Sequence, residues 1–241
     1  MDLEAQIAQL SFNILLVASV LLAILVTISL RTKHPSDHLK QFLFFSIIAA
    51  VILPTLYLIG STIYLNAVSA SKGPVHWHAD IEIWNCGKEV ELKDPEGMLS
   101  NKIGTATLHE HNDKRIHLEG VVVHPEDASL GKFFKVIGGE LNSDSVVVPS
   151  TNGQLPLTSG SICPDGQEGQ VQVFAYQTDK DNYYSQKKLE NPGEYLISPY
   201  SVVPPGDCII VEFGPVKSRT EKLCRSYKVA ETIDKLKGER R

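Results

Sequence analysis

The chain has 241 residues, of which 43% are hydrophobic, and a formal net charge of −5. Its charged residues are segregated, because none occurs from Ala5 to Leu30 or from Gln41 to Ser71. This distribution excludes a single soluble globule. The chain after Lys72 is long enough for one domain with its own hydrophobic core, and its composition has no signature of disorder.

Two apolar segments predict transmembrane helices. The hydrocarbon core of a bilayer is about 30 Å thick, so roughly 20 helical residues cross it. Phe12 to Leu30 supplies 19 residues and Phe42 to Leu65 supplies 24. Pro54 lies inside the second segment, and we expect it to kink that helix rather than end it. The acidic start, Met1-Asp-Leu-Glu, argues against a cleaved signal peptide.

The link between the two segments predicts their orientation. Residues 31–40 contain three basic residues, Arg31, Lys33 and Lys40. The positive-inside rule therefore places this link in the cytoplasm and both flanking regions outside. We expect a two-pass cell-membrane protein with the lipid bilayer as a partner. Its expected parts are a short external amino end (1–11), spans at 12–30 and 41–65, an extracytoplasmic domain (73–216) and a basic tail (217–241).

The order of these parts resembles subunit II of the haem–copper oxidases, which has a two-helix hairpin and a β-rich external domain. The resemblance implies another membrane protein or a respiratory-type complex as a partner. The family's dicopper site does not carry over, because it needs two nearby Cys followed by His and Met. Here no two Cys are closer than 16 residues, and the last His is His124. The Cys-x-His-x-Met cluster of a one-copper cupredoxin is also missing.

The external domain is predicted to be a small α+β domain. Apolar and polar residues alternate from Val75 to Trp84, with Ala79, Ile81 and Ile83 on one face. A helical spacing follows from Leu130 to Ile137 and stops at two glycines. Further strands are expected at 89–92, 108–111, 116–123, 145–149, 170–177, 195–198 and 208–213. The predicted fold is thus a membrane hairpin followed by mainly antiparallel strands with one packed helix, and β-grasp is the candidate subtype.

The carboxyl-terminal tail carries nine basic and four acidic residues from Lys217 onward. Its pattern favours a helix, which is either solvated or packed against the acidic body or a membrane surface.

The four cysteines indicate disulfides. Their external location permits oxidation, and four cysteines allow three complete pairings. We expect one or two bridges among Cys86, Cys163, Cys208 and Cys224. A thiolate metal site is disfavoured because no Cys-x-x-Cys spacing occurs.

Histidines gather in the first part of the external domain. Six of the eight fall between residues 76 and 124, namely His76, His78, His109, His111, His117 and His124. Residues i and i+2 of a strand share a face, so each His-x-His pair places two rings side by side. If these strands are neighbours, several imidazole nitrogens can bind one ion. Imidazole suits copper and zinc among other metals, and we predict one of these two as the cofactor.

Acidic residues accompany the histidines and are candidates for ligands or for carboxylates that orient the rings. They are Asp80, Glu82, Glu110 and Glu119. With the two His-x-His strands, this part of the chain is similar to membrane-anchored prokaryotic proteins that have a His-x-His-rich external domain. That resemblance implies no particular activity.

Two hydrolase resemblances fail on neighbouring residues. His76-Trp-His78-Ala-Asp80 is similar to the His-x-His-x-Asp motif of metallo-β-lactamase-type hydrolases, but Ile81 stands where that family has another His. The related motif of amidohydrolases belongs to a (β/α)₈ barrel that this domain is too short to form. The sequence also has no phosphate-binding loop, and its acidic body before residue 217 argues against nucleic acid as a partner.

These observations predict an extracytoplasmic metal-binding protein that captures, delivers or senses a metal, or an accessory subunit of a membrane complex. No catalytic residue is predicted. Two alternatives stay open, an interaction module with a purely structural metal site and a metalloenzyme with an open coordination position.

Overall fold

The computed structural model describes residues 3–96, 101–197 and 206–240. The chain divides into two compact units, Met1–Gly73 and Pro74–Arg241. The first unit is a helical hairpin and the second is an α+β domain, as the predicted fold class describes.

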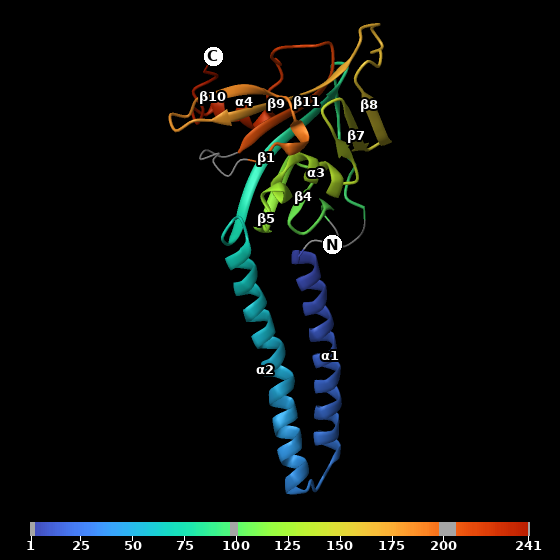
Figure 1. Ribbon diagram of the computed structural model, residues 1–241, viewed down its shortest axis with the longest axis vertical. Helices are drawn as coiled ribbons and strands as arrows, with labels where there is room; N and C mark the ends of the chain where they lie inside the picture. Colours follow the sequence, from blue (N-terminus) through green and yellow to red (C-terminus); the bar gives the residue numbers. More distant parts are fainter. Residues whose placement is uncertain (1–2, 97–100, 198–205, 241) are drawn as a thin grey trace. The chain divides into compact units, whose positions relative to one another are not determined.

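The first unit is a pair of long helices, α1 (Leu3–Arg31) and α2 (Asp37–Val68), which pack side by side (Figure 1). Both are long and apolar enough to cross a membrane. Ser36 caps α2 by accepting a hydrogen bond from the backbone N–H of Leu39 at 3.3 Å. As expected, α2 continues through Pro54. Large apolar side chains such as Phe45 and Leu53 are exposed on this pair, which is what a lipid environment requires.

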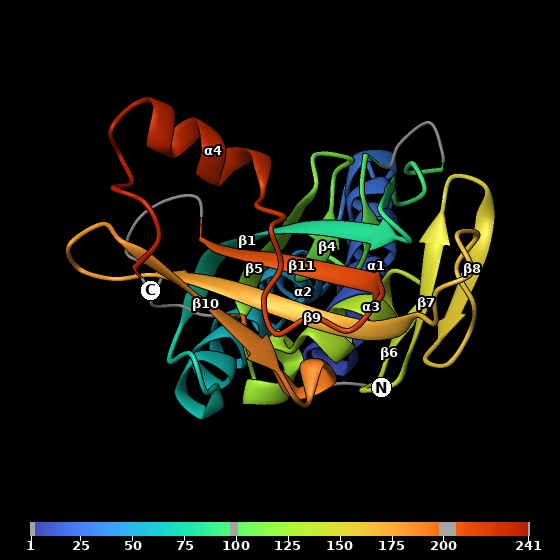
Figure 2. The same cartoon turned by 90° about the horizontal axis from the view of Figure 1, so that it is seen from above.

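The second unit is built on an eight-stranded mixed sheet and a smaller three-stranded sheet (Figures 1 and 2). The large sheet has the order β10-β9-β11-β1-β5-β4-β3, with β2 also paired to β1, and the small one has the order β6-β7-β8. The strands of the large sheet are β1 (Pro74–Asn85), β2 (Lys88–Val90), β3 (Ile103–Gly104), β4 (Leu108–Glu110), β5 (Arg115–Val121), β9 (Gln170–Thr178), β10 (Tyr184–Leu189) and β11 (Asp207–Gly214). Those of the small sheet are β6 (Glu140–Leu141), β7 (Ser145–Ser150) and β8 (Gly153–Thr158).

Strand β1 lies in the middle of the large sheet and sets its pairing. It runs parallel to β11, with Ile81 opposite Ile209, and antiparallel to β5, with His78 opposite His117. The predicted alternation is confirmed, because Ala79, Ile81 and Ile83 are all buried in the main core. The residues that alternate with these three along the strand therefore point to the opposite face.

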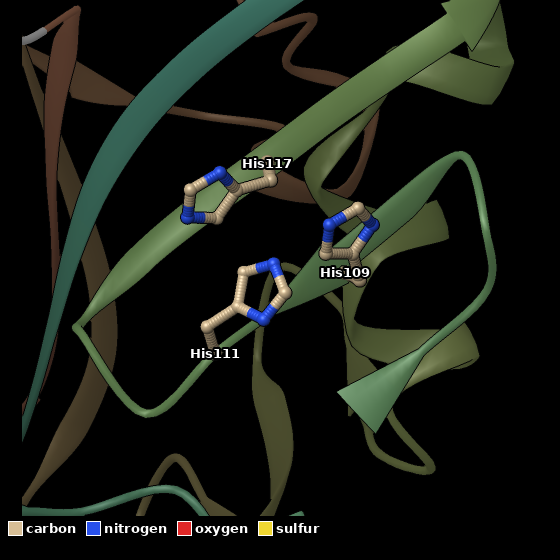
Figure 3. A group of neighbouring side chains, drawn as sticks. All are labelled: His109, His111 and His117. Carbon is tan, nitrogen blue, oxygen red and sulfur yellow. The ribbon is translucent and has the colours of Figure 1, made fainter. Parts of the chain in front are cut away.

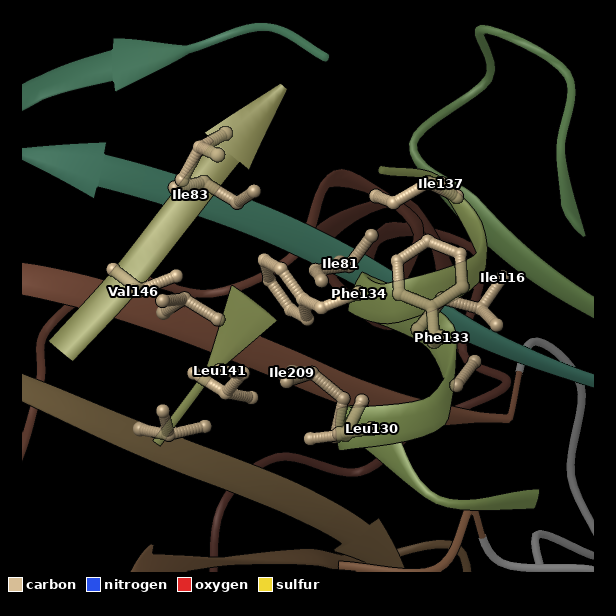
Figure 4. Close-up of a cluster of buried hydrophobic side chains, with 14 of the residues drawn as sticks. Ile81, Ile83, Ile116, Leu130, Phe133, Phe134, Ile137, Leu141, Val146 and Ile209 are labelled. Atoms are coloured by element: carbon tan, nitrogen blue, oxygen red, sulfur yellow. The ribbon is translucent and has the colours of Figure 1, made fainter. Parts of the chain in front are cut away.

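The main core lies between this face of the sheet and helix α3 (Leu130–Val136), as Figure 4 shows. Ser129 caps the helix by accepting from the backbone N–H of Lys132 at 3.1 Å. Leu130, Phe133 and Phe134 are fully buried, which confirms the predicted apolar face of this helix. Two short 3₁₀ turns flank helix α3 and contact it. They are η1 (Pro125–Ala128) and η2 (Pro192–Glu194).

A second apolar cluster covers the other face of β9 and β11. Helix α4 (Arg225–Thr232) places Tyr227 and Ala230 there against Phe174 and Ile210. The tail is thus packed against the body, and its helix is limited to these eight residues, whereas the sequence favoured a helix from Lys217 onward. Its packing is the second of the two alternatives that the sequence left open.

Two disulfides are present, as expected for the cysteines. Cys86–Cys163 joins the end of β1 to the loop before β9, and Cys208–Cys224 joins β11 to the residue before α4. Both bridges link segments that are distant in sequence, so both restrict the unfolded chain.

Some strand predictions were wrong or missing. No strand forms at residues 195–197, where η2 is followed by a single bridge between Leu196 and Ser129; residue 198 lies outside the described residues. Strands β3, β6, β8 and β10 were not predicted. All four lie at sheet edges, where polar residues are tolerated; β3 and β6 have only two residues each, and the alternation in β8 and β10 is weak.

Candidate metal centre

Four histidines, His76, His78, His109 and His117, lie on the polar face of three neighbouring strands. His78 of β1 is directly opposite His117 of β5, and His117 is directly opposite His109 of β4. The next pair on the same face of β1 and β5 is His76 opposite Glu119. Core residues such as Ile116 and Leu118 occupy the intervening positions and point to the other face. This register therefore brings His78 into a single row with His109 and His117, which lie more than 30 residues further along the chain.

A first group consists of His109, His111 and His117, with one potential ligand atom of each within 4.8 Å of the others. Figure 3 shows these three rings side by side over β4 and β5. The ring centroids of His109 and His111 are 4.7 Å apart, and those of His111 and His117 are 4.9 Å apart. We call this set the histidine triad.

A second group consists of His76, His78 and Glu119, again within 4.8 Å of one another. The Nε2 atoms of His76 and His78 are 3.0 Å apart, and His76 Nε2 is 3.4 Å from Glu119 Oε1. We call this set the outer group, because the His76 side chain is 65% exposed whereas that of His109 is 1% exposed.

His109 is the most informative member of the triad. Its ring is fully buried, and within the described part of the chain neither of its nitrogens has a hydrogen-bond partner. Buried polar atoms in proteins are almost always partnered, so a ring with two orphaned nitrogens points to a ligand. Burial, assisted by the nearby charge of Lys102, lowers the pKa of His109 to about 4. The ring is therefore neutral at neutral pH, which is the form that binds a metal.

The tautomers of the other two triad members follow from their partners. His111 Nδ1 is 2.8 Å from the carbonyl oxygen of Asn101, so Nδ1–H donates and Nε2 keeps its lone pair. His117 Nε2 donates to Asp113 Oδ2 at 3.1 Å, so Nδ1 keeps its lone pair. A histidine oriented by a carboxylate in this way is typical of metal sites.

In the outer group the pKa of His78 is lowered, first by partial burial and then by the neighbouring rings of His117 and His76. Mutual repulsion of protonated rings thus also favours neutral imidazoles on this face.

Sequence reasoning missed Asp113 and Asn101. Asp113 lies four residues before His117, on the turn between β4 and β5, and only the folded turn brings it back to the ring. The predicted orienting carboxylates are placed differently. Glu119 alone of the four lies against the rings in the described structure, 3.9 Å from His109 and 4.0 Å from His117.

The other three carboxylates bind elsewhere. Asp80 accepts from Arg115 Nε at 2.7 Å and from the Ser226 hydroxyl. Glu82 accepts from the backbone N–H of Arg225 at 3.0 Å. Glu110 accepts from the backbone N–H groups of Asp113 and Lys114 at 2.7 and 3.0 Å. These residues hold the turn and the tail in place.

His124 belongs to neither group in the described structure. It occupies the position before η1, where its backbone N–H donates to Asp127 Oδ2 at 3.1 Å. Five of the six predicted histidines therefore come together, and the sixth begins a turn.

Comparison with protein-family models, curated proteins and solved structures finds no match for this chain. The geometry alone therefore defines the class of protein. It has two helices that are able to cross a membrane, and a disulfide-containing α+β domain with histidine groups that could hold a metal ion.

Proposed function

We propose that this chain is a two-span membrane protein whose external domain binds copper or zinc reversibly for capture, delivery or sensing. The observation that carries the proposal is the buried ring of His109, whose two nitrogens have no partner in the described structure and which lies beside two histidines with assigned lone pairs. Three imidazole nitrogens form a ligand set suited to copper or zinc, with copper bound more tightly under the Irving–Williams order.

Reversible binding is supported by an incomplete ligand set. A closed structural zinc site has four protein ligands, whereas the triad supplies three. The strands on either side of the triad are also joined by their own ladder and core contacts, so the fold does not need an ion to hold them together. An ion bound here keeps a position through which it can be exchanged with a partner membrane protein.

The external location is part of the proposal. It is supported by the basic link at residues 31–40 and by two disulfides, which persist in oxidising compartments. A carboxyl-terminal fusion of alkaline phosphatase, which is active only outside the cytoplasm, should be active in a bacterial host. An inactive fusion together with an active one inserted at Ser36 would overturn the orientation.

Metal binding is tested with the full-length protein in detergent, stripped with a chelator and titrated calorimetrically with Cu(II) and Zn(II). His111→Ala should weaken binding of the tightest ion by at least about 100-fold, because one of three ligands is lost. The double variant His34→Gln/His38→Gln removes the exposed histidines of the link and serves as the matched control, with affinity unchanged. Parent-like binding by both His111→Ala and His109→Ala would refute the proposed function.

A further inference from the structure

Glu119 lies between the histidine triad and the outer group. Its Oε1 atom is 3.4 Å from His76 Nε2 in the outer group and 4.0 Å from His117 Nδ1 in the triad. Its Oε2 atom is 3.9 Å from His109 Nε2 in the triad. A carboxylate has two oxygens that can bind different ions, so this residue is able to serve both groups.

Two donor pairs of the outer group already have the spacing that an ion imposes. Two donors held at about 2.0–2.1 Å from one ion are about 2.9 Å apart at a right angle and about 3.4 Å apart at the tetrahedral angle. The observed separations, 3.0 Å between the nitrogens of His76 and His78 and 3.4 Å from His76 to Glu119, fall within this interval. Two of the three donor pairs of the outer group therefore already have the separation that a common ion requires, and the third lies within 4.8 Å.

We infer that this face of the sheet binds two ions, one in the triad and one in the outer group, with the Glu119 carboxylate shared between them. The inference rests on the proposed function and extends it from one ion to a dinuclear centre. Ions bridged in this way lie about 3.5–4 Å apart, and the shared negative charge reduces their repulsion.

The two positions differ in access. In the dinuclear centre one Glu119 oxygen fills the position that the triad alone leaves open, so the inner ion has four protein ligands. Its His109 and His117 side chains are only 1% and 12% exposed. The outer ion has two histidines and the other oxygen, with Glu119 at 39% exposure. Three protein ligands leave one coordination position open to solvent, which is where a donor or acceptor of metal would approach. The outer position is thus the site of exchange and the inner one the site of retention.

The experiment uses full-length protein in detergent that carries His34→Gln/His38→Gln, so that link histidines do not contribute. Zn(II) content after saturation and gel filtration should be two ions per chain. With Cu(II), the shared carboxylate should couple the two spins, so the integrated paramagnetic resonance signal falls below that of two isolated ions. One ion per chain, or two uncoupled Cu(II) ions, would overturn the inference.

Two variants locate the second ion. Glu119→Gln and His78→Ala should each reduce Zn(II) to one ion per chain and give the full signal of a single uncoupled Cu(II). The matched controls are Glu126→Gln, which removes an exposed carboxylate on η1, and His124→Ala, and both should keep two ions. If Glu119→Gln keeps two ions and only loses 10–100-fold in affinity, Glu119 merely orients the rings and the bridge is refuted.

Failure of this inference is distinguishable from failure of the proposed function. A parent that binds one ion, lost in His111→Ala and kept in His78→Ala, would retain the proposed function and refute the second ion. A parent that binds no ion stoichiometrically would refute both.

Discussion

Replacing His109 with Leu should stabilise the metal-free protein, and this advantage should shrink or reverse when metal is bound. The side chain is fully buried, and within the described residues its two ring nitrogens have no hydrogen-bond partner. In metal-free protein these nitrogens are desolvated without compensation, and each unsatisfied buried group costs about 1–3 kcal/mol. Leucine has a similar size and no polar atom, so it removes this cost.

The expected magnitude is a net gain for the metal-free domain. The two nitrogens together cost about 2–6 kcal/mol and the shape difference between the two side chains costs up to about 1.5 kcal/mol, which leaves roughly 0.5–6 kcal/mol of stabilisation. For a domain of this size that corresponds to a rise of roughly 1–17 °C in Tm. In Zn(II) at 100 times its dissociation constant the parent gains about 2.7 kcal/mol, whereas the variant, with the triad broken, gains much less. The stability advantage of the variant over the parent should therefore become smaller or reverse when metal is added.

The assay is thermal unfolding followed by tryptophan fluorescence in chelator and in Zn(II). The chain has two tryptophans, Trp77 and Trp84, and both lie on β1, so the signal reports the α+β domain rather than the helix pair. The control is His124→Leu, an exposed histidine outside both groups, which should respond to Zn(II) like the parent. A loss of more than about 1 kcal/mol in metal-free His109→Leu would show that the ring nitrogens are satisfied, and the reasoning from orphaned atoms would fail.

Two further predictions concern the domain away from the metal centre. Burial raises the pKa of Tyr176 to about 12 and also raises the pKa of Tyr184, Tyr195 and Tyr227. These rings therefore contribute stability in full below pH 10, the ordinary tyrosine value, and lose it progressively as pH rises above 10 toward each raised pKa. Tyrosinate absorbance and circular dichroism recorded together should show these rings ionising only as the domain unfolds, and their ionisation near pH 10 in folded protein would contradict this. Replacing both cysteines of a bridge with alanine should destabilise the domain by about 3 kcal/mol for Cys208–Cys224, which are 16 residues apart, and by about 4.5 kcal/mol for Cys86–Cys163, which are 77 apart. Urea unfolding measures both losses, and equal losses, or none, would contradict the loop-entropy argument.

Local sequence patterns determined several features of this protein. The uncharged runs around Val20 and Ile52 are long enough to specify two membrane-length helices by themselves, because helix length and apolarity are local properties. The alternation in β1 likewise assigned His76 and His78 to the face opposite Ile81, since a strand has a fixed period of two. The apolar spacing of Leu130, Phe133 and Phe134 specified α3 for the same reason.

The tertiary structure decided which of these faces meet. The register that sets His117 opposite both His78 and His109 depends on packing of the whole core, and a shift of one residue would turn the β5 histidine into that core. Three features depend on distances between residues that are far apart in the chain or across a turn. They are the burial of His109, the contact of Asp113 with His117 and the pairing of the cysteines. No local period encodes such distances. The sequence by itself therefore determined which residue types could bind a metal and the faces they occupy. Their division into two groups and the position of Glu119 between them follow from strand neighbours that only folding brings together.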